Sequence, residues 1–167
     1  MAKAKAVTTT KIKKKLWLPI IAPPLFKGMT LGETYVAEPA TTAGRVIRIN
    51  LKEITHNLKD QNVYIKFKIT NVSGNTLNTE SCGYYLTPPS IKKLSRRNTE
   101  RLDDSFIVVT IDGKKLRIKP VSITLNMVPR SINSKIALTI RNSIANEVSK
   151  MTFIELIEKL ITRQLQI

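Results

Sequence analysis

Residues 63–70 alternate between apolar side chains of one parity and polar or aromatic side chains of the other. The apolar parity consists of Val63, Ile65, Phe67 and Ile69. The other parity consists of Tyr64, Lys66, Lys68 and Thr70. A period of two cannot keep one face of a helix apolar, so it predicts a strand with one face in a core and the opposite, basic face outward.

A hairpin is predicted around Asp112-Gly113, a dipeptide favoured in tight turns. It joins an apolar run at residues 105–110 to a returning segment at residues 114–125. In the returning segment, cations alternate with apolar residues; the cations are Lys115, Arg117 and Lys119. We therefore expect a second strand with a basic outward face.

The returning segment changes its apolar parity at Pro120, from even positions before the proline to odd positions after it. Because proline cannot donate to a strand ladder, this change indicates a bulge or a corner. Together with a further strand at residues 45–50, these features predict a small antiparallel β-barrel over residues 31–129.

A short helix is predicted within the barrel region. Thr87 can cap it with its hydroxyl group, and Pro88 and Pro89 suit its first turn. The helix is expected to extend to Arg97. Its last six residues, 92–97, would then carry four cations.

The C-terminal region, residues 130–167, is predicted to be helical. Branched apolar residues recur there at four-residue spacing: Ile132, Ile136, Ile140, Ile144 and Val148. Thr152-x-x-Glu155 is a capping box that begins a second helix, with an inward face made of Phe153, Ile157, Leu160 and Ile161. The predicted fold class is therefore α+β.

Two segments precede the predicted barrel: a solvated basic arm at residues 1–15 and an extended, proline-rich strap at residues 16–30. The arm's lysines are Lys3, Lys5, Lys11, Lys13, Lys14 and Lys15. We expect Trp17 to anchor the strap to the core, with stacking on a base as the alternative. Prolines interrupt the apolar stretch of the strap, so we expect neither a signal peptide nor a membrane span, and a soluble cytoplasmic chain.

The chain carries 28 Lys and Arg against 12 Asp and Glu, a formal charge of +16. This excess predicts a polyanionic partner, RNA above all, because cations that neutralise phosphates release condensed counterions. The candidate phosphate contacts outside the arm are Arg45, Arg48, Lys66, Lys68, Lys92, Lys93, Arg96, Arg97, Lys114, Lys115, Arg117, Lys119 and Arg130. Aromatic residues make up only 5% of the chain, and no paired ring platform is visible, so we expect recognition of RNA shape and backbone.

Residues for catalysis are scarce. His56 is the only histidine and Cys82 the only cysteine, so neither a histidine pair nor a cysteine-based metal site can form within one chain. We predict an exposed His56, a buried Cys82, and no catalytic residue, metal site or cofactor. A metal-dependent nuclease that uses Asp103, Asp104 and Asp112 is the enzymatic alternative.

Several patches together resemble the e-S-one (S-three-a) family of archaeal and eukaryotic small-subunit ribosomal proteins. They are Lys15-x-Trp17, Ala22-Pro23, Phe26, Gly44-Arg45-Val46, Lys66-Phe67-Lys68-Ile69, Tyr85-Leu86-Thr87, Arg96-Arg97, Asp112-Gly113, Leu116-Arg117 and Thr152-Phe153 with Glu155-Leu156. Two departures limit the transfer. Pro88 stands where the family has a basic residue, and family members continue beyond the position of Ile161 with another helix and a basic strand, whereas this sequence ends at Ile167.

The resemblance implies a non-enzymatic, structural constituent of the small ribosomal subunit that binds rRNA and other ribosomal proteins on the platform. It also implies a place near the mRNA exit, with mRNA as a further candidate partner. We expect no membrane partner, because no segment is as long as an uninterrupted apolar membrane span. Contact with rRNA is implied for Lys15, Trp17, Arg45, Lys66, Lys68, Arg96, Arg97 and Arg117. A free RNA-binding barrel protein is the alternative within the same chemistry.

Overall fold

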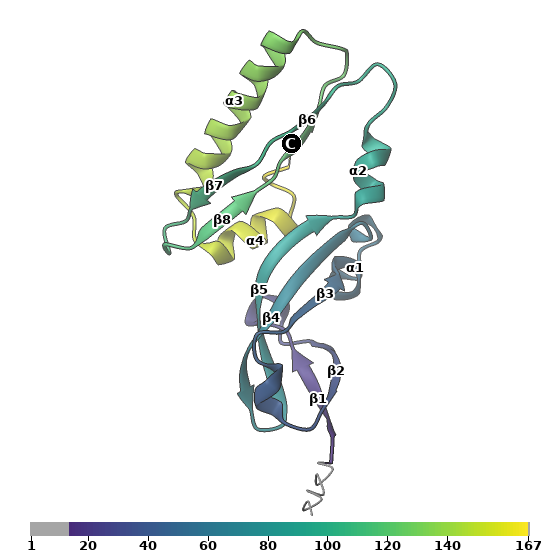
Figure 1. The fold of residues 1–167 in the computed structure, drawn as a ribbon, viewed down its shortest axis with the longest axis vertical. Coiled ribbons are helices and arrows are strands. Elements are labelled where there is room, and N and C mark those ends of the chain that lie inside the picture. Colours follow the sequence, from purple (N-terminus) through teal and green to yellow (C-terminus); the bar gives the residue numbers. More distant parts are fainter. Residues whose placement is uncertain (1–13, 167) are drawn as a thin grey trace, which may run out of the picture. The chain divides into compact units, whose positions relative to one another are not determined.

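The computed structural model describes residues 14–166 (Figure 1). The chain divides into two compact units. Of the described residues, unit 1 comprises 14–49 and 65–83, and unit 2 comprises 50–64 and 84–166. Both contain strands, and the long helices belong to unit 2, so the α+β class is confirmed.

A five-stranded sheet contains the first five strands of the chain. They are β1 (Leu16–Ile21), β2 (Thr30–Val36), β3 (Val46–Asn50), β4 (Val63–Ser73) and β5 (Thr76–Leu86). The strand order is β2-β1-β5-β4-β3. β1 pairs with β2 in antiparallel register, and Ile20 and Ile21 pair with β5 in parallel register.

The predicted small antiparallel barrel is not found among the described residues. The five-stranded sheet ends at β2 and β3, and the later strands form separate two-stranded sheets. One cause is the segment at residues 16–21, predicted as a strap. It is instead a strand between β2 and β5, and its pairing with β5 is parallel.

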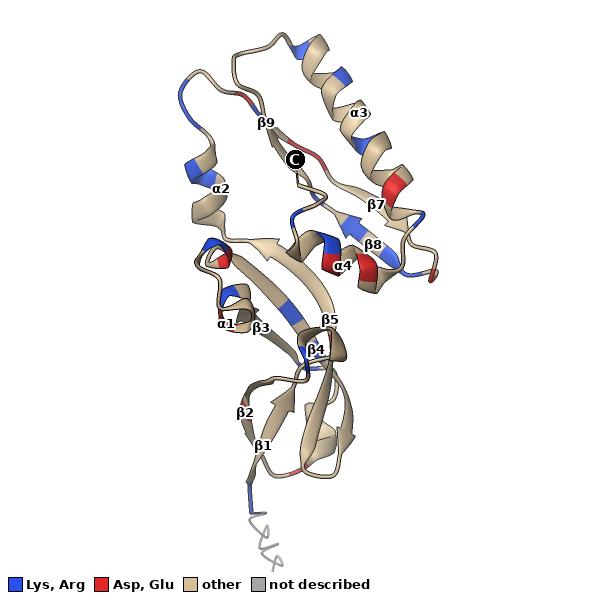
Figure 2. Ribbon diagram, turned by 180° about the vertical axis from the view of Figure 1, so that it is seen from behind, with Lys and Arg blue, Asp and Glu red and all other residues tan. Residues whose placement is uncertain are grey.

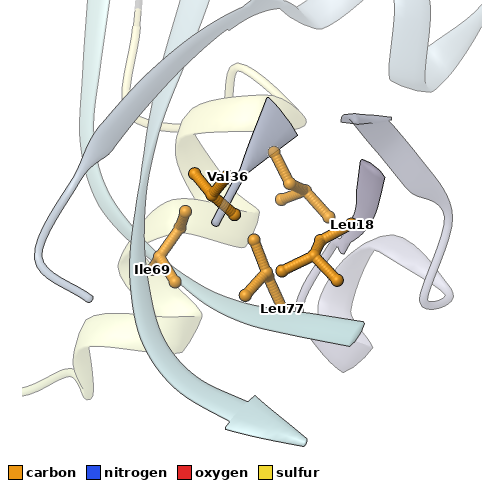
Figure 3. Packing of buried hydrophobic residues seen from close by; sticks show 5 residues of the cluster. Leu18, Val36, Ile69 and Leu77 are labelled. Atoms are coloured by element: carbon orange, nitrogen blue, oxygen red, sulfur yellow. The ribbon is translucent and has the colours of Figure 1, made fainter. Parts of the chain in front are cut away.

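The core of unit 1 lies on one face of this sheet. It is formed by the buried residues Leu18, Ile20, Val36, Ile69 and Leu77, four of which are labelled in Figure 3. On β4, the apolar residues of the alternating segment are buried, as predicted from the period of two. Phe67 is fully buried and meets Phe26 edge-on, with 5.3 Å between ring centroids. The other face of β4 is therefore free to carry lysines.

A glycine bulge joins the start of β3 to β4. The N–H of Gly44 donates to the carbonyl oxygen of Ile69 at 2.8 Å, and the N–H of Ile69 donates to the carbonyl oxygen of Arg45 at 2.9 Å. Gly44 has a φ of 85°, which glycine adopts at no steric cost. The bulge fixes the register in which Arg48 of β3 stands beside the lysines of β4.

The short helical turns connect the strands of the large sheet. The 3-10 turns are η1 (Pro24–Phe26), η2 (Pro39–Thr42) and η3 (Leu58–Asp60), and α1 is Leu51–Thr55. Asn50 caps α1 by accepting from the N–H of Lys52 at 3.0 Å. His56 ends this helix at a φ of 55° and is exposed, as predicted.

The predicted hairpin is confirmed in unit 2. β7 (Phe106–Val109) pairs antiparallel with β8 (Lys115–Ile118), and Gly113 takes a φ of 72° in the turn. β9 (Val121–Ile123) pairs instead with β6 (Arg101–Asp103). The parity change at Pro120 thus marks the point where the chain leaves one two-stranded sheet for another.

Two helices cover the inward face of the β7–β8 hairpin. They are α3 (Arg130–Val148) and α4 (Phe153–Ile161), and their core with β7 is built from Val108, Val148 and Leu156. The capping box of Thr152 and Glu155 is present as predicted. Leu156 is buried, although the sequence pattern did not assign it to the inward face of α4.

The four-residue stripe of α3 does not stay in contact with this core along its length. Val148 is buried, whereas Ile132 is 45% exposed, and Asn133 is buried in its place. A spacing of four residues exceeds a helical turn by about 40°, so the stripe rotates away from the core over successive turns.

The basic helix α2 (Pro88–Leu94) is shorter than predicted. Arg96 and Arg97 lie beyond its end, in a turn where the backbone N–H of Arg96 donates to the hydroxyl of Thr99 at 3.0 Å. The expected cap by the Thr87 hydroxyl is wrong, because no side-chain cap hydrogen bond is formed there. Proline in the first turn is confirmed.

Two arginines bind carboxylates that are distant in the sequence within unit 2. Arg141 of α3 binds Asp104 through two hydrogen bonds of 2.6 and 2.9 Å. Arg163 binds the buried carboxylate of Asp60 at 2.7 Å, and Thr55 donates to the same carboxylate at 2.9 Å. The hydrogen bond from Arg141 is the main cause that lowers the pKa of Asp104 below its ordinary value, and the N–H of Ser105 adds to it.

We expect Phe67→Ala to lower the free energy of unfolding by about 3–5 kcal/mol, because it removes a fully buried ring and leaves a cavity. Chemical denaturation followed by circular dichroism measures this loss. Val46→Ala is the matched control on the exposed face of β3, with an expected loss below about 1 kcal/mol. Equal losses would contradict the assignment of the buried face.

We expect Arg141→Met to raise the pKa of the Asp104 carboxyl toward its ordinary value, because the donor that favours the charged form is removed. A carboxyl group with a lowered pKa stabilises the folded state fully above its ordinary pKa. This contribution is lost as the pH falls through the lowered value. NMR titration of the side-chain carboxyl carbon measures both proteins, and an unchanged titration midpoint would show that Arg141 does not hold this carboxylate in solution.

Candidate nucleic-acid interface

The outward face of β3 and β4 carries predicted phosphate contacts in unit 1. Arg48 on β3 and Lys68 on β4 are exposed, and Lys66 is half-buried at the next outward position of β4. Arg45, also exposed, lies at the bulge before β3. Because the opposite face of β4 is packed in the core, these cations stand on a rigid element. The structure thus brings three of the predicted residues to one sheet face, whereas Arg45 has the parity of the inward-facing residues Ile47 and Ile49.

A second group in unit 1 joins two aromatic rings and a lysine. Trp17 on β1 pairs in register with Tyr35 on β2, and the two ring centroids lie 4.9 Å apart. The ammonium group of Lys15 lies 5.6 Å from the centroid of the Tyr35 ring. Trp17 is 64% exposed and Tyr35 is 50% exposed. The expectation that Trp17 anchors β1 in the core is therefore wrong.

The missed residue in this group is Tyr35. No local pattern pairs it with Trp17, because the two are 18 positions apart and the strap was not expected to be a strand. The alternation of Leu18 and Ile20 with Trp17 and Pro19 was the available signal for a strand with Trp17 on its outward face. The prediction that no paired ring platform exists is corrected by this cross-strand pair.

In unit 2, the outward face of the β7–β8 hairpin is basic and apolar at once. Arg117 stands opposite Ile107, and Lys115 stands opposite Val109. All four side chains are exposed, while the intervening residues of both strands face α3 and α4. The predicted basic face of the returning segment is confirmed, and Lys119 is exposed just beyond β8.

The remaining cations of unit 2 are spread over several elements, as Figure 2 shows for α2, β8 and α3. Lys92 and Lys93 are exposed on the last turn of α2, and Arg130 is exposed at the first residue of α3. Arg96 and Arg97, in the turn after α2, are exposed as well. These five residues do not share one secondary-structure element.

Lys114 makes a more local contact than the other cations. Its ammonium group lies 5.0 Å from the centroid of the Phe153 ring, at the start of α4. Of the arm lysines, Lys14 and Lys15 are exposed. Lys3, Lys5, Lys11 and Lys13 lie outside the described residues.

The acidic residues that a nuclease would need have separate structural partners. Asp103 pairs with Arg101, Asp104 pairs with Arg141, and Asp112 accepts from the first N–H of α4. Within residues 14–166, no group of three histidine, cysteine or acidic residues could hold a metal ion. The carboxylates therefore do not converge on one point.

Cys82 on β5 is exposed, so the prediction of a buried filler is wrong. The cause is its place on the strand. Leu77 and Thr79 occupy the buried parity of β5, and Cys82 falls on the other.

No helix in the described part of the chain is long and apolar enough to cross a membrane.

Comparisons with known proteins give the chain a family. The model of the Ribosomal S3Ae family matches residues 3–167. A protein of Nanoarchaeum equitans is 31% identical over 153 residues, which cover 92% of this chain and 77% of that protein. A protein of Methanobrevibacter smithii is 29% identical over 167 residues, covering 99% of this chain and 86% of that protein. Both relatives are named small ribosomal subunit protein eS1.

The match extends over nearly the whole sequence and includes every strand and helix described above, so it is not carried by one motif. It also agrees with the basic outward faces of β4 and β8, which suit a protein that meets RNA. The chain belongs to the Ribosomal S3Ae family.

Proposed function

We propose that this protein is a structural constituent of the small ribosomal subunit that binds rRNA through backbone phosphates. The observation that carries the proposal is the arrangement of β4, where buried apolar residues alternate with outward lysines, beside Arg48 of β3. A cationic face on a rigid strand can hold phosphates without a large loss of backbone freedom. The names of the eS1 relatives support the ribosome as the place of assembly.

Family membership indicates a structural, non-enzymatic role, and the proposed location is the ribosome in the cytoplasm. The separate partners of Asp103, Asp104 and Asp112 agree with this role, because a metal-dependent nuclease needs carboxylates that meet at one ion. Contact with mRNA near its exit from the subunit belongs to the proposal as an implication of the family resemblance.

Contacts with neighbouring ribosomal proteins are also part of the proposal. Ile107 and Val109 are exposed on the outward face of the β7–β8 hairpin, beside Arg117 and Lys115. Apolar side chains gain nothing from phosphates, whereas an adjoining protein can bury them. This face could therefore contact a neighbouring protein through its apolar residues and RNA through its cations.

The proposal predicts how single cations contribute to rRNA affinity. Arg48→Gln and Lys68→Gln should each weaken binding and reduce the slope of log affinity against log salt concentration by about one, because each removes about one phosphate contact. Titrations of transcribed small-subunit rRNA at several salt concentrations measure both quantities. Circular dichroism confirms that the variants are folded.

The matched control is Lys150→Gln, which removes the same charge at an exposed position outside the predicted contacts. It should leave the salt slope almost unchanged. If all three variants lose affinity equally, binding depends on net charge alone and the face of β3 and β4 has no special role. A wild-type protein that binds rRNA without any salt dependence would contradict the phosphate mechanism.

A further inference from the structure

Two exposed rings and a lysine meet on β1 and β2 in a way that phosphate binding does not require. Trp17 and Tyr35 lie opposite each other in the strand register, with an angle of 34° between their ring planes. We propose that Trp17 and Tyr35 form a stacking site for an unpaired RNA base, with Lys15 beside it to meet the adjoining phosphate. This inference rests on the proposed RNA-binding function and specifies a contact to a base.

The exposure of the pair is the first argument. Cross-strand aromatic pairs stabilise sheets by burying ring area against each other and against neighbours. Here the chain's only tryptophan keeps 64% of its surface exposed, and Tyr35 keeps half. Trp17 does not contribute to the core, which Leu18 and Ile20 of the same strand already serve. The exposed ring surface is therefore available to a partner.

The charges around the rings are the second argument, because they favour RNA as the partner. Lys15 lies close to the Tyr35 ring, and Lys14 is exposed beside it in the sequence. A lysine that extends over an aromatic face disfavours a cationic partner and favours a group that carries both a flat ring and an anion. A nucleotide has both. Base stacking on aromatic side chains tolerates any of the four bases, so this site does not require a particular RNA sequence.

The strand register gives the site a direction. On the same outward face, the next residue pair along the strands is Pro19 and Glu33, and Glu33 is exposed. Its carboxylate repels phosphate. The RNA backbone is therefore expected to pass the end of the site near Lys14 and Lys15, with the base directed over the two rings.

Trp17 itself supplies the measurement, because it is the only tryptophan and a stacked base quenches its fluorescence. The full chain is titrated with a ten-nucleotide oligouridylate and, separately, with the abasic sugar-phosphate chain of the same length and charge. We expect the oligouridylate to quench the emission and to bind roughly 5- to 100-fold more tightly than the abasic chain. Phosphate contacts alone predict equal affinities.

Variants separate the rings from the rest of the surface. Tyr35→Leu and Trp17→Leu keep apolar volume but remove a ring, and each should bring oligouridylate affinity close to the abasic level. Affinity is read from the anisotropy of labelled RNA, which does not need Trp17. Leu16→Ala is the matched control, an exposed apolar residue next to Trp17 without a ring. It should leave the preference for bases intact.

Binding of rRNA and of the two short chains separates the stacking site from the proposed function. If structured rRNA binds but the oligouridylate and the abasic chain bind equally without quenching, the stacking site is wrong and the phosphate mechanism stands. If Trp17 and Tyr35 bind a protein rather than a base, the oligouridylate and the abasic chain would likewise bind equally. If neither rRNA nor the oligouridylate binds, both proposals are overturned. If Trp17→Leu does not fold, Tyr35→Leu alone tests the stacking site. That variant keeps Trp17, so both fluorescence quenching and anisotropy can still be measured.

Discussion

The separation of the two faces of β4 is the constraint on which unit 1 depends. Ile65, Phe67 and Ile69 are buried, and their burial fixes which side of the strand faces outward. A shift of one residue in register would bury Lys66 and Lys68 and expose the core, which costs both the desolvation of two charges and the loss of apolar burial. The same apolar residues that stabilise the sheet therefore position the cations.

The β7–β8 hairpin of unit 2 has the same division into an apolar inward face and a basic outward face, and helices cover its inward face. Val108 and Leu116 face the helices α3 and α4, and their neighbours Arg117 and Lys115 face outward. Asp112, in the hairpin turn, accepts from the N-terminus of α4 and so links the turn to the helix that covers the inward face. Asp112 and Asp104 thus link elements that are distant in the sequence, while the predicted phosphate contacts of this unit are exposed.

The sequence predicted what periodicity and turn chemistry determine locally: β4, the hairpin at Asp112-Gly113, and the capping box at Thr152. It failed where the outcome depends on pairing between distant segments. The barrel was wrong because nothing local shows that β1 lies between β2 and β5, and Tyr35 was missed for the same reason. The roles of the predicted phosphate contacts stay predictions, because positive charge makes every exposed Lys and Arg a candidate and does not select among them.

Sedimentation tests the central claim most directly. A native lysate is fractionated on sucrose gradients at low and at moderately high salt, and this chain is followed by mass spectrometry. We expect it to sediment with the small ribosomal subunit and to remain there when the salt is raised, because the proposed phosphate contacts and protein neighbours would act together. Recovery only at the top of the gradient at both salt concentrations would contradict a structural role in the ribosome.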